Sequence, residues 1–252
     1  MLVLLPPSET KRDGGTSAPL ELGELSFPEL AEPRATVVAA VRSLADDPDA
    51  MMRALKLGPR QAGEVQRNRS LLASPTMAAV DRYTGVLFDA LDAPSLDAAA
   101  RGWAAAHLSV HSALFGLVGA LDAIPAYRLS HDSRLPGLRL KTVWRGAVSQ
   151  RLDDQEGLII DLRSEGYADL GPAPSREDSV YVRVVSADGQ GRRRALNHFN
   201  KRAKGLFARA LLEDRPDLGD RDDLTDWARG AGFALVPRPA DPARPGELEL
   251  VA

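Results

Sequence analysis

The chain has 252 residues, of which 44% are apolar, and its formal net charge at pH 7 is −3. This is enough apolar material for one large domain or two small domains with a substantial core. The slightly acidic balance provides no global positive field, so a nucleic-acid partner would have to be held by a local basic patch. The chain contains no cysteine, which excludes disulfides, thiolate metal sites, cysteine-ligated iron–sulfur clusters and a peroxidatic thiol.

The chain begins with an apolar run, Leu2 to Leu5, which ends at two prolines. The run has no basic flank and is too short for a signal peptide or a membrane span, so it predicts a buried interior strand. No other apolar run approaches the length that crosses a membrane, and we therefore expect a cytoplasmic protein with no membrane partner. Residues 8–33 predict a long polar loop, and loops of this length are often functional.

Helical spacing of apolar residues predominates between residues 35 and 91. One helix is predicted over 37–44 and a second from Pro48; after a break at Leu57-Gly58-Pro59, a third helix is predicted from Arg60. A further helix is expected to carry four residues on one face: Met77, Val80, Tyr83 and Leu87.

The pattern changes to strands from Trp103 onward. A short apolar strand is predicted over 158–162. Alternation over 179–186 and 192–199, with turn residues between them, predicts a hairpin. A helix from Asn200 follows the hairpin.

The end of the chain predicts a short helix around Trp227 and a pairing of residues 233–236 with 247–251. Strands interleaved with helices and hairpins favour a mixed α/β or α+β fold over a doubly wound parallel sheet. We therefore expect a single compact domain over residues 1–252, with a central mixed sheet and a helical insertion.

Several segments resemble a known family. The run Ser112-Ala113-Leu114-Phe115-Gly116, then Leu121-Asp122 and Pro125-Ala126-Tyr127-Arg128-Leu129, is similar to Ser-Gly-Leu-Tyr-Gly, Leu-Asp and Pro-Tyr-Arg-Leu of the YaaA (peroxide stress) family. Residues 161–167 and 201–205 resemble that family's Asn-Leu-Ala-Ser-x-Glu-Tyr and Lys-Lys-Ala-Arg-Gly. The resemblance covers nearly the whole chain. It implies a role in the response to hydrogen peroxide, together with a lowered level of free iron.

The chain also departs from the family pattern. Glu9 stands where the family's Ser-Pro-Ala-Lys-Thr has its lysine, and Lys11 follows two residues later. Asp161 replaces an asparagine. Gly166 lies where glutamate is usual, with Glu165 beside it as a candidate substitute. Gly119 and Ala120 replace an Arg-Pro pair.

The first candidate site is the basic stretch 48–72, which resembles a helix-hairpin-helix. In such a motif a glycine turn lets backbone N–H groups and a helix N-terminus approach a DNA phosphate closely. The alternative is an ordinary turn, in which Gly58 ends one helix and Pro59 begins the next. We expect double-stranded DNA to be bound without sequence preference by five residues: Arg53, Lys56, Gly58, Arg60 and Arg67.

The second candidate site is the basic helix that follows the hairpin. Its cations, opposite an apolar face, predict a phosphate or polyanion site: Lys201, Arg202, Lys204 and Arg209. Glycine inside a helix costs ~1 kcal/mol relative to alanine, so Gly205 indicates close approach of a backbone or ligand. The alternative is a solvated polar face.

The third candidate site is a polar cleft where strand ends converge, a common place for binding pockets. It would contain Ser112, Tyr127, Arg128, Ser164 and Tyr167. We expect Ser112, Arg128, Ser164, Tyr167, Lys201 and Lys204 to share one concave surface on which Arg128 binds an anion. The alternative is that Tyr127 and Arg128 form a structural turn with a buried salt bridge.

These patterns leave three functions open. The first is a DNA-binding protein of the peroxide response, and the second is an enzyme acting on a phosphorylated or nucleotide substrate in a cleft between Arg128 and Lys201. The third is a structural or interaction protein. His107 and His111, four residues apart, would suit a metal pair on one strand face; without a third ligand, a core or edge histidine is favoured. We expect neither a metal nor a cofactor.

Overall fold

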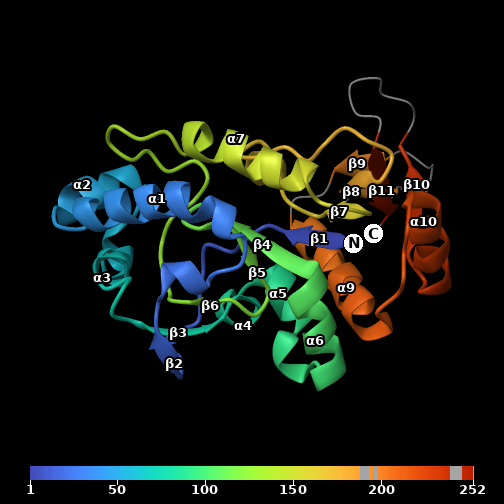
Figure 1. Ribbon diagram of the computed structural model, residues 1–252, viewed down its shortest axis with the longest axis horizontal. Helices are drawn as coiled ribbons and strands as arrows, with labels where there is room; N and C mark the ends of the chain where they lie inside the picture. Colours follow the sequence, from blue (N-terminus) through green and yellow to red (C-terminus); the bar gives the residue numbers. More distant parts are fainter. Residues whose placement is uncertain (188–192, 196–197, 239–245, 252) are drawn as a thin grey trace.

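In the computed structural model, which describes residues 1–187, 193–195, 198–238 and 246–251, strand β1 (Leu2–Leu5) lies inside a sheet (Figure 1). It pairs in parallel with β4 (Leu108–Ser112) on one side and with β7 (Ile159–Asp161) on the other. All four of its residues are buried. A strand covered on both faces is expected to be apolar throughout, so the prediction of an interior first strand is confirmed.

The main sheet of the described residues has the order β10-β11-β8-β7-β1-β4-β5, with β9 beside β8. Five neighbouring strands are parallel, and they are β11 (Glu247–Val251), β8 (Ser179–Ala187), β7, β1 and β4. Three strands are antiparallel to their neighbours, and they are β5 (Gly116–Gly119), β9 (Arg193–Ala195) and β10 (Ala234–Pro237). The mixed sheet is therefore confirmed, although its centre is a run of parallel strands.

Helices cover both faces of this sheet (Figure 1). On one face lie α1 (Ala31–Leu44) and α7 (Leu140–Asp153), and on the other lie α5 (Val86–Leu91), α6 (Ala98–His107) and α9 (His198–Asp214). Trp144 of α7 is fully buried and its indole donates to Ala113 O over 2.9 Å. One continuous core joins the layers, as expected for a single domain.

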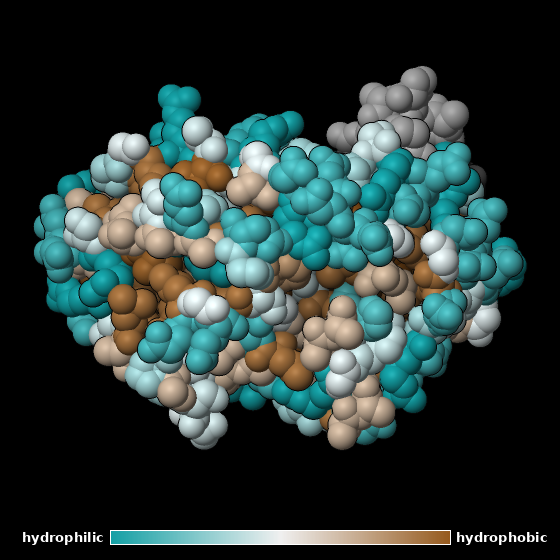
Figure 2. Space-filling view, in the orientation of Figure 1, coloured by the Kyte–Doolittle hydropathy of each residue, from teal (hydrophilic) through white to brown (hydrophobic). Residues whose placement is uncertain are grey.

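The remaining elements are short. They are β2 (Ser17–Pro19), η1 (Leu22–Glu24), η2 (Pro28–Leu30), α2 (Pro48–Ala54), η3 (Pro59–Gln61), α3 (Gly63–Arg69), β3 (Pro75–Ala78), α4 (Ala79–Arg82), η4 (Ala93–Ser95), β6 (Ala123–Ile124), α8 (Glu165–Ala168) and α10 (Arg221–Gly230). Strands β2, β3 and β6 form a second, three-stranded sheet. Apolar side chains gather on the surface below α1, within an otherwise largely polar face (Figure 2).

The prediction that strands begin at Trp103 is wrong, because Trp103 lies inside α6. The segment is rich in alanine, which has the highest helix propensity, and the Asp97 side chain caps it by accepting from Ala100 N over 2.7 Å. His107 is therefore the last residue of a helix and does not share a strand face with His111 on β4. Its Nδ1 lies 3.0 Å from Met1 O.

The single helix predicted from Met77 to Leu87 is also wrong. Met77 belongs to β3, α4 ends at Arg82, Tyr83 is extended, and Leu87 belongs to α5. The chain changes direction at Gly85, whose φ of +102° disfavours any side chain. Residues 8–33 are likewise not an unbroken loop, since they contain β2, η1, η2 and the start of α1.

The C-terminal predictions are confirmed where the structure describes them. β8 and β9 pair antiparallel, β10 and β11 pair antiparallel, and α10 contains Trp227. The turn at 188–191 and Arg192 lie outside the described residues. Among the described residues, no helix has the length and apolarity needed to cross a membrane.

Gly205 provides a test of the packing between α9 and α5. A Cβ at Gly205 would lie 2.2 Å from the Leu87 carbonyl oxygen, so Gly205→Ala should destabilise the fold by ~1–3 kcal/mol. The control is Gly146→Ala in α7, where a Cβ meets nothing within 4 Å; it should stabilise by ~0.5–1 kcal/mol. Urea unfolding measures both. Equal effects in the two variants would contradict the packing argument.

Candidate functional site

The topology indicates where a site is expected. The carboxyl ends of the parallel strands β1, β4 and β7 meet at one edge of the sheet. From β1 the chain proceeds to β4 on one side, whereas from β7 it proceeds to β8 on the other. In open α/β sheets ligands bind at the point where successive connections diverge in this way. Two segments flank this point. One follows β1 and includes Ser8, and the other follows β7 and begins at Leu162.

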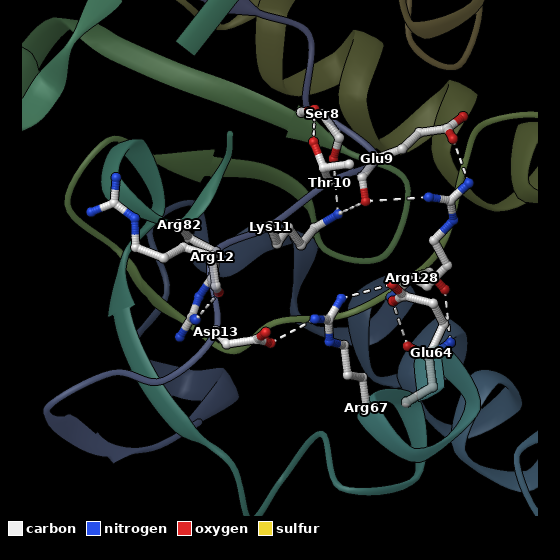
Figure 3. Close-up of polar contacts among 11 residues, drawn as sticks. Ser8, Glu9, Thr10, Lys11, Arg12, Asp13, Glu64, Arg67, Arg82 and Arg128 are labelled. Carbon is white, nitrogen blue, oxygen red and sulfur yellow. Dashed lines mark hydrogen bonds and ion pairs between the residues drawn. The ribbon is translucent and has the colours of Figure 1, made fainter. Parts of the chain in front are cut away.

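Lys11 is the centre of a polar cluster after β1 (Figure 3). Its Nζ donates to Ser8 O over 2.8 Å and to Glu9 O over 3.4 Å. The same nitrogen lies 3.9 Å from the centre of the Tyr127 ring and 5.2 Å from that of Tyr83. Lys11 is 7% exposed. We call Ser8, Glu9, Lys11, Glu64, Arg67, Tyr83, Ser112, Tyr127 and Arg128 the Lys11 cluster.

Burial and, to a smaller extent, the positive charge of Arg128 lower the pKa of Lys11 to about 7. The carboxylates of Glu64 and Glu9 oppose this change. A lysine with such a pKa is substantially neutral near pH 7, and a neutral amine is a base and a nucleophile.

Arg128 lies beside Lys11 and is held at both ends. Its guanidinium pairs with the Glu9 carboxylate and lies 3.4 Å from Glu9 O. Its backbone is fixed by buried Asn68 of α3, whose amide donates to Arg128 O over 2.7 Å and accepts from Arg128 N over 2.8 Å. The helical segment 48–72 therefore positions Arg128.

Ser112, Tyr127 and Tyr83 form a buried chain of hydroxyl groups. Ser112 Oγ accepts from the backbone N–H groups of Leu114 and Phe115, each over 3.0 Å. Because these bonds use both lone pairs of the oxygen, Ser112 must donate its hydrogen to the Tyr127 hydroxyl at 2.7 Å. Tyr127 then donates to the Tyr83 hydroxyl at 2.8 Å. The hydroxyl groups of Ser112, Tyr127 and Tyr83 are thus joined in one buried hydrogen-bonded group.

Arg67, a predicted DNA contact, belongs to the Lys11 cluster. It donates to Glu64 over 2.7 Å and to Asp13 over 2.6 Å (Figure 3). The second carboxylate oxygen of Glu64 is buried without a hydrogen-bond partner in the described part of the chain. Buried Arg82 donates to Arg12 O over 2.6 Å and thereby holds the loop that precedes Asp13.

A second cluster surrounds buried Lys204 of α9. Lys204 Nζ donates to Arg163 O over 3.0 Å and lies 5.4 Å from the centre of the Tyr181 ring. Burial lowers the pKa of Lys204 to about 8, and the charge of Asp161 opposes this. Arg163 in turn makes a buried bidentate pair with Asp161, at 2.6 and 2.9 Å.

His111 belongs to the same buried network, because its Nδ1 accepts from Arg163 over 2.8 Å. Burial, with Arg163 beside it, holds the pKa of His111 well below its ordinary value. The imidazole is therefore neutral and its hydrogen is on Nε2, which has no partner among the described residues. This agrees with the prediction of a core histidine.

A cavity of about 430 Å³ lies beside this second cluster. Its lining includes Asp161, Glu165 and Tyr181. Glu165, the candidate substitute for the family's glutamate, pairs with Arg183 over 2.7 Å. The space beside Gly166 is filled by the imidazole of His131, which would lie 2.5 Å from a Cβ at this position. A glutamate side chain therefore has no room there.

The structure brings together some of the predicted cleft residues and separates others. Ser112, Tyr127 and Arg128 belong to the Lys11 cluster. Tyr167 is buried and close enough to Tyr127 to be influenced by it, because burial and, second, Tyr127 raise the pKa of Tyr167. Ser164 precedes α8 and follows Arg163, the residue that Lys204 contacts.

The other cations of α9 have different surroundings from buried Lys204. Lys201 and Arg202 are exposed in the first turns of the helix. Arg209 donates to the carbonyls of Leu91 and Asp92 at the end of α5, each over 3.0 Å. Gly205 is explained by close approach of the α5 backbone.

The helical segment 48–72 forms two short helices, α2 and α3, with η3 between them. The left-handed residue of the turn is Lys56, at φ +55°, whereas Gly58 is extended. Lys56 pairs with Asp132 over 2.5 Å, while Arg53 and Arg60 are exposed.

The sequence pattern does not single out Lys11, Tyr83 or Asn68 as site residues. For Lys11 a signal existed, because it follows the first strand within two residues of the family's lysine. The connection between Asn68 and Arg128 spans 60 residues and leaves no trace in the local pattern.

The family model described as peroxide stress protein YaaA matches residues 1–238. The chain belongs to this family. A UPF0246 protein of Corynebacterium efficiens is 42% identical over 240 residues, which are 93% of this chain and 94% of the relative. A UPF0246 protein of Streptomyces coelicolor is 39% identical, with 100% of this chain and 98% of the relative covered.

The described residues contain no group of three or more histidine or acidic side chains arranged to hold a metal ion.

The pKa of Lys11 predicts a pH dependence of stability. Between pH 7 and about 10.5 the unfolded chain keeps a proton on Lys11 that the folded chain loses, so stability rises with pH in this window. Relative to Lys11→Met, the free energy of unfolding of the wild type should rise by about 2 kcal/mol from pH 7 to pH 9. Urea unfolding at both pH values measures it. A difference that is independent of pH would contradict the perturbed pKa.

Proposed function

We propose that this member of the peroxide stress family binds a phosphate-bearing small molecule, such as a nucleotide, at the Lys11 cluster and acts on it as an enzyme. The observation that carries the proposal is the pairing of Arg128 with the Glu9 carboxylate beside Lys11. Arginine binds carboxylates and phosphates with the same planar fork of donors. Glu9 therefore occupies the position that a ligand anion would take.

The burial of the two partners supports an exchange of Glu9 for a ligand. The side chain of Arg128 is 12% exposed, whereas that of Glu9 is 57% exposed. Glu9 can thus leave into solvent while Arg128 stays fixed by Asn68. An incoming anion would meet Arg128 and the Lys11 amine.

Ligand binding tests this proposal. Inorganic phosphate, pyrophosphate and AMP are titrated calorimetrically into the wild type and Arg128→Gln. Loss of a charge-assisted hydrogen bond should weaken binding by roughly tenfold or more, while Glu9→Gln should strengthen it by removing the internal competitor. Lys141→Gln, an exposed cation on α7 paired with Asp169, is the control. Equal affinity in Arg128→Gln and the wild type would reject the site.

Non-specific DNA binding is a second candidate function, favoured by the exposure of Arg53 and Arg60 on either side of the turn between α2 and α3. Two exposed cations beside a pair of short helices suit contacts to phosphates of a duplex. Lys56 is less suited because it already pairs with Asp132.

The salt dependence of DNA affinity tests this second candidate. Each lost phosphate contact should flatten the slope of log affinity against log salt by ~0.9. The double variant Arg53→Ala, Arg60→Ala should therefore lose up to two such increments for every duplex sequence alike. Arg145→Ala on α7, which pairs with Asp169, is the control. An unchanged slope in the double variant would exclude this segment as the contact.

A further inference from the structure

We propose that Lys11 forms an imine with an aldehyde or ketone substrate whose phosphate group is held by Arg128. This inference rests on the phosphate-binding function proposed above and deepens it by naming the reacting group. The substrate class is a small phosphorylated carbonyl compound.

The geometry places a nucleophile beside an anion-binding group. Lys11 Nζ and the Arg128 guanidinium both lie 3.4 Å from the same acceptor, Glu9 O. A ligand anion that replaces the Glu9 carboxylate at Arg128 would therefore bring its own neighbouring atoms close to Lys11. The centre of the Tyr127 ring lies 3.9 Å from Nζ, and Lys11 is 7% exposed, so the amine has little contact with water.

Lys11 is the residue of this cluster suited to covalent chemistry. Its pKa is lowered to about 7 by burial and by Arg128, so near neutral pH about half of the side chains carry a lone pair. Desolvation next to another cation is an established way to activate a lysine towards carbonyl groups. The groups that face it, Arg128, Glu64, Glu9 and Arg67, include no carbonyl-reactive competitor.

The reaction balances without an additional reactant. The nitrogen lone pair attacks the carbonyl carbon, the C–N bond forms, and the carbonyl π electrons move to oxygen. A proton passes from nitrogen to that oxygen to give a carbinolamine. The C–O bond then breaks, and the hydroxyl leaves with the second amine proton as water.

Reductive trapping tests the proposal on the intact protein. Glyceraldehyde 3-phosphate and glyceraldehyde are each incubated with the protein and sodium cyanoborohydride near pH 7, and labelled lysines are located by peptide mass spectrometry. The chain has five lysines, namely Lys11, Lys56, Lys141, Lys201 and Lys204, so the others serve as internal controls. With the phosphorylated probe, Lys11 should be labelled at least about tenfold faster than exposed Lys56 and Lys141, because its neutral fraction is far larger.

Variants separate the roles of the residues. Arg128→Gln should reduce labelling of Lys11 by glyceraldehyde 3-phosphate to the rate seen with glyceraldehyde, and Glu9→Gln should increase it. Lys11→Arg should abolish trapping at position 11 while phosphate still binds through Arg128.

The outcomes distinguish the two proposals. If phosphate binds in an Arg128-dependent manner but Lys11 is labelled no faster than Lys56, the imine is rejected and the binding function stands. If Lys11 is labelled equally fast by both probes, the phosphorylated substrate class and the anion role of Arg128 are rejected. Labelling of Lys204 in preference to Lys11 would also overturn the assignment.

Discussion

The burial of the Lys11 amine next to the Arg128 guanidinium is the constraint on which the rest of the site depends. Two cationic groups lie close together at the edge of the sheet, where desolvation disfavours charge. Carbonyl oxygens of Ser8 and Glu9, the face of Tyr127 and nearby carboxylates compensate for this cost. These groups do not fully offset the cost of burying the charge, and the pKa of Lys11 is therefore lowered. An amine that is about half neutral near pH 7 is thus a consequence of how the strand ends are packed.

Buried arginines hold the loops that form this edge. Arg34 of α1 donates to the carbonyls of Phe115, Leu117 and Ser26, and Arg82 donates to Arg12 O, so each ties segments far apart in the sequence. A buried guanidinium has five donors, and burying a donor without an acceptor is costly. Backbone carbonyls accept from most of these donors, while Nη1 of Arg34 has no partner among the described residues. This arrangement fixes irregular backbone without disulfides, in a chain that has no cysteine.

The helical segment 48–72 has a structural role in the site, whatever its role towards DNA. Asn68 of α3 makes both backbone hydrogen bonds of Arg128, and Arg134 N donates to Ala54 O of α2. The segment therefore supports the loop that carries Arg128. A substitution inside α3 would disturb the backbone of Arg128, whereas exposed Arg53 and Arg60 can be changed without touching the Lys11 cluster.

Elements with a distinct pattern of apolar and polar residues over a few positions could be predicted from the sequence alone. The apolar run Leu2–Leu5 could only be an interior strand, and the run around Ile159, the alternation of β8 and the family motif near Ser112 were equally local. The sequence pattern misplaced the segment from Met77 to Leu87, whose apolar residues keep helical spacing although the backbone is extended at Tyr83 and takes a φ of +102° at Gly85. Only the tertiary structure selected Lys11, by burying it against Tyr127 and beside Arg128, residues more than 110 positions away. Burial and charge proximity depend on contacts between distant segments, and these are what turn an ordinary lysine into a reactive one.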